Sequence, residues 1–168
     1  MKKNINTFKI FNGLSNDQIE LFTDFIKIKE YKKNQTIINE GDYGDSLLFI
    51  LKGEIIISQA LTLATNKYDQ TDTREKQLTN LNSDDHEIML GEIALCSPDK
   101  KRNASVKAVK DCKIAEINFN KIFEICNENN SVGYKIMKNL SEIITNNLIN
   151  SNNKVLKLTT AFSLLIDQ

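Results

Sequence analysis

One short stretch of the chain, GEIALCSPDKKRNAS over residues 91–105, holds an acid near its start and a basic cluster near its end. Arg102 follows Glu92 by ten residues and stands just ahead of a strand-like run. A guanidinium group can donate to two phosphate oxygens at once, whereas a carboxylate accepts and therefore suits a hydroxyl group. Gly91 lets the backbone lie close to a bound group, and the N–H groups of a helical turn after it favour an anion. A ribose phosphate offers both the phosphate and the hydroxyl at short range.

The residues alone leave a plainer interpretation open. Glu92 and Arg102 could form a simple surface ion pair around a loop. Lys100 and Lys101, beside the arginine, are expected to be solvated rather than to bind a ligand.

The composition limits the class of protein. With 168 residues, 40% of them hydrophobic, the chain can bury one substantial core, and a single domain over 1–168 is expected. The 22 basic and 22 acidic residues balance, which argues against binding nucleic acid or an anionic membrane over the whole surface. No apolar run approaches the roughly 20 residues of a membrane span, and no secretory stretch follows the first residues. We therefore expect a cytoplasmic protein with no membrane partner.

The residues that could bind metal or perform catalysis are few. Cys96, Cys112 and Cys126 are widely spaced without a CxxC pair, so they are interpreted as apolar thiols. His86 is the single histidine and is expected in a solvated loop. We predict no metal site, no catalytic residue and no cofactor, and hence a protein that binds rather than an enzyme.

The elements that must position the 91–105 stretch begin with a helical lead-in over 1–25. Ser15 precedes an apolar-periodic run with Gln18 three residues later, a capping-box pattern that predicts a helix over 16–24. Short Ile- and Leu-rich runs between glycines predict strands over 26–117. Many short strands without intervening helices indicate an antiparallel β-roll or jelly-roll barrel, and hence an α+β fold. The polar stretch 60–77 is predicted to be a long exposed loop or hairpin tip.

Residues 118–168 are predicted to be helical, with one short helix and a long one over 131–165. Two heptad series in the long helix are apolar at eight of ten positions, which indicates a coiled-coil seam and a homodimer. They comprise Tyr134, Ser141, Leu148, Val155 and Phe162, and Met137, Ile144, Ser151, Leu158 and Leu165. A second apolar face is expected to pack on the strands and comprises Ile136, Leu140 and Ile143. The alternative is that this part folds back on its own barrel. The Asn-rich run 146–154 forms helix poorly, so a bend is expected there.

Two motifs in this order resemble a known family. GEIAL…RNASV is similar to the phosphate-binding cassette of cyclic nucleotide-binding domains, and EGDYGDSLLFILKGEI resembles the turns and strand that precede it. The order of helix, barrel, short helix and long helix also matches, over about residues 8–165. Bacterial cyclic-AMP-responsive regulators resemble the chain into the long helix and then continue into a DNA-binding domain. No DNA-reading element is recognised on this chain, and Met1 with the seam to Leu165 favours a standalone domain.

The resemblance implies roles for the cassette residues. Gly91 and Glu92 match the residues that meet the ribose 2′-hydroxyl. Ile93 and Ala94 match the helix that offers backbone N–H groups, and Arg102 matches the phosphate-binding arginine. The residues expected to line the phosphate are Asn103, Ala104 and Ser105.

Three departures from the family pattern stand out. Asn103 replaces the usual small residue after the arginine. The approach to the cassette, LNSDDHEIMLGE, is longer than usual and lacks its first glycine. The stretch 60–77 is longer than the common form of this loop.

The expected ligand is cyclic AMP, with cyclic GMP second. An amide near the purine can both donate and accept, so it suits adenine and guanine alike. By position in the long helix, Asn146 and Asn147 are the candidates for a base contact, and Asn147, beside the seam, could reach the pocket of the neighbouring chain. The alternative is that both are simply exposed. Binding is expected to order the cassette and reposition the C-terminal helices. The downstream effector is not identifiable.

Two other functions remain open. One is a scaffold that keeps the roll without a ligand. The other is a cupin-type enzyme, against which the lack of a histidine cluster argues.

Overall fold

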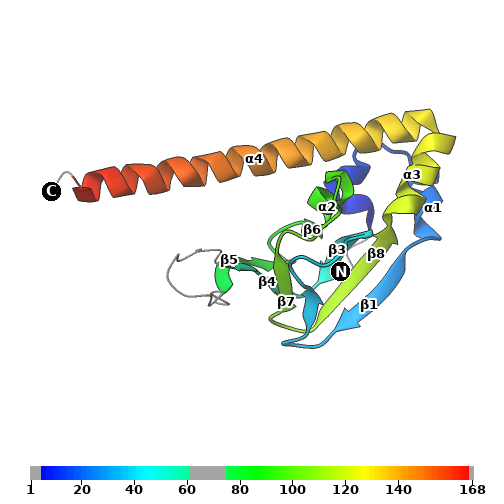
Figure 1. Cartoon of the computed structure of the whole chain (residues 1–168). Coiled ribbons are helices and arrows are strands. Elements are labelled where there is room, and N and C mark those ends of the chain that lie inside the picture. Colours follow the sequence, from blue (N-terminus) through cyan, green and yellow to red (C-terminus); the bar gives the residue numbers. More distant parts are fainter. Residues whose placement is uncertain (1–4, 61–74, 167–168) are drawn as a thin grey trace.

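The computed structural model describes residues 5–60 and 75–166. Figure 1 shows a strand roll with helices on one side and one helix that extends far beyond it. The elements in chain order are η1 (Ile5–Thr7), η2 (Lys9–Phe11), α1 (Asn16–Thr23), β1 (Lys27–Tyr31), β2 (Thr36–Ile38), β3 (Ser46–Lys52), β4 (Glu54–Ala60), β5 (Glu75–Asn82), β6 (Met89–Leu90), α2 (Glu92–Cys96), β7 (Ser105–Ala108), β8 (Cys112–Asn118), α3 (Phe119–Glu128) and α4 (Asn130–Ile166).

The strands form two four-stranded antiparallel sheets, in the orders β1-β8-β3-β6 and β2-β7-β4-β5. Strand β3 shows how the first sheet is packed, because successive side chains of a strand point to opposite faces of its sheet. Leu47 and Phe49 belong to the core shared with the helices, whereas Leu48 and Ile50 belong to the core inside the roll. Strand β3, inside the first sheet, is therefore buried on both faces, whereas the edge strand β1 is mostly exposed.

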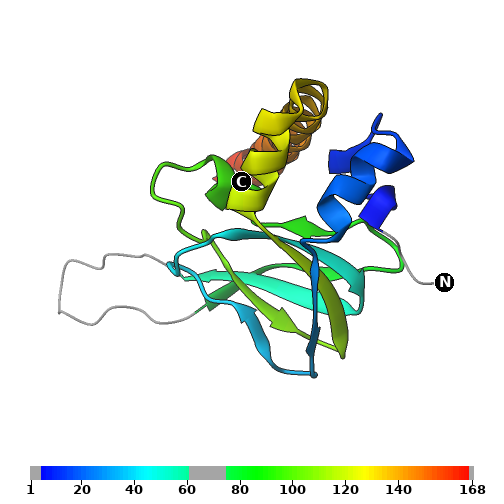
Figure 2. The ribbon, with the colours of Figure 1, turned by 90° about the vertical axis from the view of Figure 1, so that its right-hand side faces the viewer.

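The helices cover the outer face of this first sheet, as Figure 2 shows. The capping box is present at α1, where Ser15 and Gln18 exchange side-chain and backbone hydrogen bonds. Phe8, between η1 and η2, packs edge-on against Phe49 with ring centroids 4.9 Å apart. The N-terminal segments thus pack with the first sheet and the C-terminal helices in one core.

Helix α4 is continuous over 37 residues, or about 55 Å at the usual rise per residue. Its first part packs on α3 and η2 through Val132, Ile136 and Leu140. The buried side chain of Asn139 donates to the backbone oxygens of Ile10 at 2.9 Å and Asn12 at 2.8 Å. Two hydrogen bonds from one buried amide therefore tie α4 to the start of the chain.

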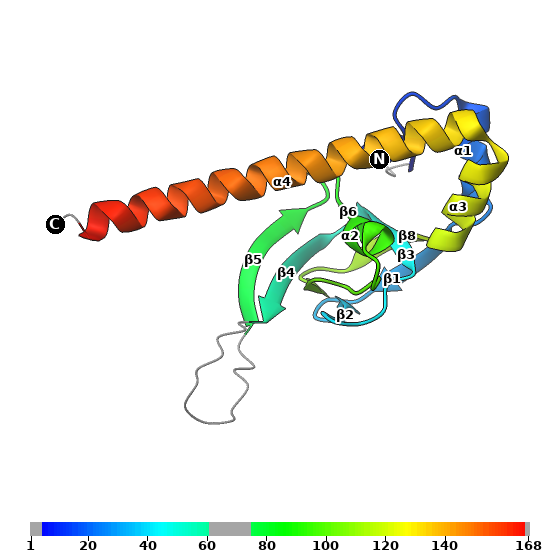
Figure 3. The ribbon, with the colours of Figure 1, turned by 45° about the horizontal axis from the view of Figure 1, so that its top comes forward.

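The second part of α4 extends away from the roll (Figures 1 and 3). Several large apolar side chains on it are more than half exposed: Leu148 59%, Val155 61%, Leu158 59%, Phe162 64% and Leu165 70%. Within the described part of the chain, no helix is both long and apolar enough for a membrane crossing.

The predicted fold class, an α+β β-roll with flanking helices and a long last helix, is confirmed. Two finer expectations were wrong, namely the bounds of the predicted loop or hairpin tip and the bend in the long helix. The predicted loop or hairpin tip over 60–77 falls between the paired strands β4 and β5. Its bounds overlap these strands at residues 60 and 75–77, and residues 61–74 lie outside the described part. The expected bend over 146–154 is absent from α4 because the helix runs through it unbroken, and the alternative fold-back onto the barrel does not occur.

Candidate functional site

Helix α2 starts directly after β6 and places the first predicted residues of the site. Gly91 caps this helix in the left-handed region, with φ of 97°. A Cβ at this position would lie 2.7 Å from the backbone oxygen of Ser46 and would overlap with Nη1 of Arg102. Glycine is therefore required both by the backbone angle and by the closeness of the arginine.

Arg102 is buried, with 9% of the residue exposed. Its Nη2 donates to the Ser46 backbone oxygen at 2.9 Å and lies 3.3 Å from Ser46 Oγ. Its Nη1 is the only buried side-chain nitrogen or oxygen in the described residues that has no hydrogen-bond partner. Burial lowers the pKa of Arg102, whereas the carboxylates of Asp45, Glu116 and Glu92 act to raise it. The guanidinium is thus held on one side and keeps a free donor on the other.

The backbone around Arg102 is fixed by the turn over 41–44. The Arg102 N–H donates to the Asp42 oxygen at 2.8 Å, and the Gly41 N–H donates to the Arg102 oxygen at 2.8 Å. A Cβ at Gly44 would lie 2.7 Å from Nε of Arg102, so this glycine leaves space for the side chain. The Gly-Asp turn of the second motif therefore supports the arginine of the first.

Glu92 is half-buried at the first position of α2. Burial raises its pKa, against the lowering effect of the Asn147 side chain and of the Arg102 charge. Asn147 Nδ2 donates to Glu92 Oε1 at 3.3 Å, across the contact between α2 and α4 (Figure 3). No ion pair joins Glu92 and Arg102 among the described residues, so the plain surface ion pair considered from the sequence is not formed.

The two asparagines predicted for a base contact, Asn146 and Asn147, lie on different faces of α4. Asn147 meets Glu92 of its own chain, whereas Asn146 lines a shallow groove on the outer face of α4 with Tyr134 and Ser141. The structure therefore brings Asn147, and not Asn146, to the residues of the cassette.

The other predicted residues flank Glu92 and Arg102 within the cassette. Both Ile93 and Ala94 belong to α2, where Ala94 is buried and Ile93 is 45% exposed. Asn103 is exposed and Ala104 is half-buried, and both directly follow the arginine. Ser105, at the start of β7, is half-buried.

Ser105 Oγ accepts a hydrogen bond from the Glu40 backbone N–H at 3.1 Å. This contact joins the start of β7 to the segment before the turn. It leaves the hydroxyl hydrogen of Ser105 available for a further acceptor.

Two residues next to the arginine were missed in the sequence. Ser46 contacts Arg102 directly, and Glu116 accepts from Ser46 Oγ at 2.9 Å. The available signal was weak: each is a polar residue at an inward position of a strand that is largely apolar.

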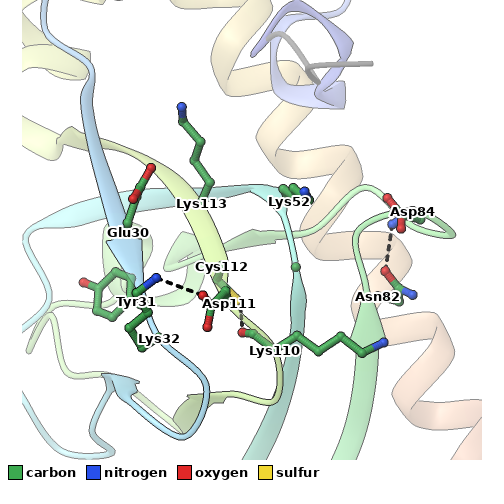
Figure 4. A pocket seen from close by; sticks show the side chains of 11 residues that line it. Glu30, Tyr31, Lys32, Lys52, Asn82, Asp84, Lys110, Asp111, Cys112 and Lys113 are labelled. Atoms are coloured by element: carbon green, nitrogen blue, oxygen red, sulfur yellow. Dashed lines mark hydrogen bonds and ion pairs between the residues drawn. The ribbon is translucent and has the colours of Figure 1, made fainter.

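A separate cavity of about 470 Å³ lies at another part of the roll, where β1, β3 and the β7–β8 turn meet (Figure 4). Its charged side chains are partly paired with one another, as Lys32 is with Asp111 at 2.9 Å. None of the residues predicted for the site lines this cavity. The described residues also contain no group of His, Cys, Asp and Glu that could hold a metal ion.

A family model described as "Cyclic nucleotide-binding domain" matches residues 28–129. The cAMP-activated global transcriptional regulator Vfr of Pseudomonas aeruginosa is 28% identical over 114 residues, which cover 68% of this chain and 49% of that protein. The regulator CRP of Pasteurella multocida is 26% identical over 140 residues, covering 83% and 59%. The chain therefore spans about half the length of the curated relatives that it matches.

Solved structures show the same fold. The Catabolite Activator Protein of Thermus thermophilus superposes with a TM-score of 0.71 at 18% identity, covering 90% of this chain and 63% of that one. A cyclic nucleotide-binding domain of Methylobacillus flagellatus superposes with a TM-score of 0.73 at 19% identity, covering 90% and 78%. The structure titled "cAMP bound PfPKA-R (141-441)" has a TM-score of 0.57 at 28% identity, covering 72% and 38%.

Proposed function

The chain belongs to the family of cyclic nucleotide-binding regulatory domains, and we propose that its own ligand is cyclic AMP, with cyclic GMP as the second candidate. The ligand lies between α2, Arg102 and the middle of α4. The relatives named as cAMP-activated regulators and the cAMP-bound structure support this choice of ligand.

The observation that carries the proposal is the unpaired Nη1 of Arg102. A buried donor without an acceptor costs free energy, and a charged donor costs more than a neutral one. A ligand phosphate beside Gly91 supplies the missing acceptor as well as an opposite charge. The fixed Nη2 directs the guanidinium so that its free side faces the cassette.

Glu92 supplies the second contact, as an acceptor for the ribose 2′-hydroxyl. In the structure this carboxylate accepts from Asn147. A ligand hydroxyl that donates to Glu92 Oε1 competes with Asn147 for this oxygen, and the amide of Asn147 is then free to contact the purine. Through this exchange the ligand biases the position of α4, which is the readout of binding.

We also propose that the protein is a homodimer in the cytoplasm and acts by binding, without catalysis. The exposed apolar stripe from Leu148 to Leu165 supports the dimer, since extended apolar patches mark interfaces. Two α4 helices side by side would cover the stripe of each other around a twofold axis.

Calorimetric titration of the purified chain with cyclic AMP, cyclic GMP and the open-ring 5′-AMP tests the ligand. We expect cyclic AMP to bind most tightly and Arg102→Ala to weaken it at least about tenfold, because a lost partner of a buried charge costs about 2–5 kcal/mol. Thermal unfolding of the free variant checks that it is folded. If neither cyclic nucleotide binds to a folded dimer, the chain is instead a ligand-free scaffold built on the same exposed stripe.

A further inference from the structure

The free side of Arg102 depends on how its other side is held. Nη2 has two acceptors, the backbone oxygen and the hydroxyl of Ser46. The backbone oxygen has a fixed direction. A hydroxyl group can rotate, and it accepts from Nη2 only while its own hydrogen points elsewhere.

Glu116 gives that hydrogen a fixed direction. Ser46 Oγ donates to Glu116 Oε1 at 2.9 Å, so the lone pairs of the hydroxyl remain turned toward Arg102. The two residues meet because β3 and β8 are paired and both side chains lie on the inner face of the sheet, as Leu48 and Ile114 do. A carboxylate at this inward position therefore has a partner that explains its presence.

Lys29 on β1 completes the chain of contacts. Its Nζ lies 2.5 Å from Oε2 of Glu116, whose side chain is only 18% exposed. Hydrogen bonding to Glu116 raises the pKa of Lys29, as expected for a lysine that remains charged. A half-buried carboxylate close to an anion site would repel the anion, and the lysine offsets that charge.

On the premise that Arg102 binds the ligand phosphate, we propose that Ser46 and Glu116 are positioning residues for Arg102, and that Lys29 sets the affinity by balancing the charge of Glu116. The contacts run from the cassette through β3 and β8 to the exposed side of β1. A surface lysine outside the ligand site thus affects the strength of ligand binding.

The first experiment compares variants at Glu116 that remove the same charge. Glu116→Gln keeps an acceptor for Ser46 Oγ, whereas Glu116→Leu does not. We expect Gln to retain affinity for cyclic AMP within about threefold, and Leu to bind about three- to tenfold more weakly, the effect of one lost hydrogen bond. Equal affinities in the two variants would show that the hydroxyl is not held by Glu116.

A double-mutant cycle identifies the route of the effect. Ser46→Ala is expected to weaken binding about three- to tenfold. Adding Glu116→Leu should weaken it no further, because both changes act through one hydroxyl. Fully multiplied losses in the double variant would refute this route. Ser46→Thr, which keeps the hydroxyl, should restore most of the affinity.

The third comparison tests the surface lysine. Lys29→Met leaves the Glu116 charge unbalanced and should weaken cyclic AMP binding about two- to fivefold at low salt. Lys32→Met is the matched control, since it removes the same charge from a pair that is more exposed and lies at the separate cavity (Figure 4). If both variants weaken cyclic AMP binding equally, Lys29 acts only through the net charge of the protein and not through Glu116.

A measurement on the free protein separates this proposal from the proposed function. In ¹⁵N NMR spectra, the Arg102 guanidinium should rotate slowly in the native chain and faster in Ser46→Ala and Glu116→Leu. Unchanged rotation in both variants would refute the positioning role even if cyclic AMP binds. Faster rotation, in a native chain that binds neither nucleotide, would support the positioning and refute the proposed ligand.

Discussion

Replacing Gly91 by alanine tests the geometry of the site with a single methyl group. The residue has φ of 97°, a backbone angle that alanine rarely adopts. Its Cβ would also meet two groups of the site, the Ser46 backbone oxygen at 2.7 Å and Nη1 of Arg102. The arginine side chain can move away, but the backbone oxygen cannot do so without shifting β3.

Gly13 is the matched control because it shares the backbone angle without the contacts. Its φ is 77°, and no atom lies within 4 Å of a Cβ built there. Left-handed alanine costs about 1–2 kcal/mol, partly offset by the lower entropy of the unfolded chain, so we expect Gly13→Ala to destabilise by about 0.5–1 kcal/mol. The additional overlap at Gly91 costs about 1–3 kcal/mol more, or about 2–4 kcal/mol in total.

Thermal unfolding and cyclic AMP titration measure the two consequences. For a domain of this size, 1 kcal/mol shifts the melting temperature by about 2–4 °C, so we expect losses of about 2 °C for Gly13→Ala and about 9 °C for Gly91→Ala. Gly91→Ala should also bind cyclic AMP at least about tenfold more weakly, since it displaces Arg102. Equal melting temperatures and full affinity in both variants would show that Gly91 does not lie against the arginine.

Three further predictions concern Glu92 and α4. Burial raises the pKa of Glu92 above its ordinary value of 4.5, so the folded chain binds more protons than the unfolded chain above that pH. The free energy of unfolding should therefore fall as the pH rises from 4.5 through the raised pKa of Glu92. Denaturant titrations at several pH values should show a smaller dependence of this free energy on pH in Glu92→Gln. A 2′-deoxy cyclic AMP should bind more weakly than the parent by about three- to tenfold, and this penalty should shrink in Glu92→Gln, as calorimetry can measure. Leu158→Glu should raise the monomer fraction in light scattering without unfolding the roll, whereas Asn150→Glu, on another face of α4, should leave the dimer intact.

Each of these has a contradicting result. An unchanged pH slope in Glu92→Gln would mean that the carboxylate titrates normally. Equal binding of the 2′-deoxy ligand to the native chain would remove Glu92 from the ribose contact. A native monomer at tens of micromolar would refute the seam, as would complete unfolding of Leu158→Glu, because the stripe would then be core.

The cassette could be predicted from the sequence because its signals are local. The glycine, the acid and the arginine lie within residues 91–105, and their types alone suggest a phosphate beside a hydroxyl. The roll was also predictable, since β3 and β8 are strongly apolar and alternate between two cores. Both results depend on neighbouring residues rather than on contacts between distant segments.

The features that the sequence analysis missed depend on the pairing of distant strands or on how exposed a strand or helix is. Ser46 and Glu116 are 70 residues apart and meet only through the register of β3 and β8. The start of strand β5, residues 75–77, was assigned to the loop because β5 lies at the sheet edge with mostly exposed side chains and lacks the apolar alternation of an inner strand. The expected bend in α4 relied on helix propensity, which is a weak guide to a long helix.

The amide of Asn139 anchors α4 to the start of the chain, so a tilt of the helix would be centred near this residue. On a rigid helix held there, two points of the same arm lie at different distances from Asn139. Asn147 lies about 12 Å along the helix from Asn139, and Ile166 lies about 40 Å from it. A tilt that shifts Asn147 by about 1 Å therefore moves the far end by about 3 Å in the same direction. On the proposed readout, a shift of Asn147 smaller than a bond length would therefore become a shift of about 3 Å at the distal end of α4.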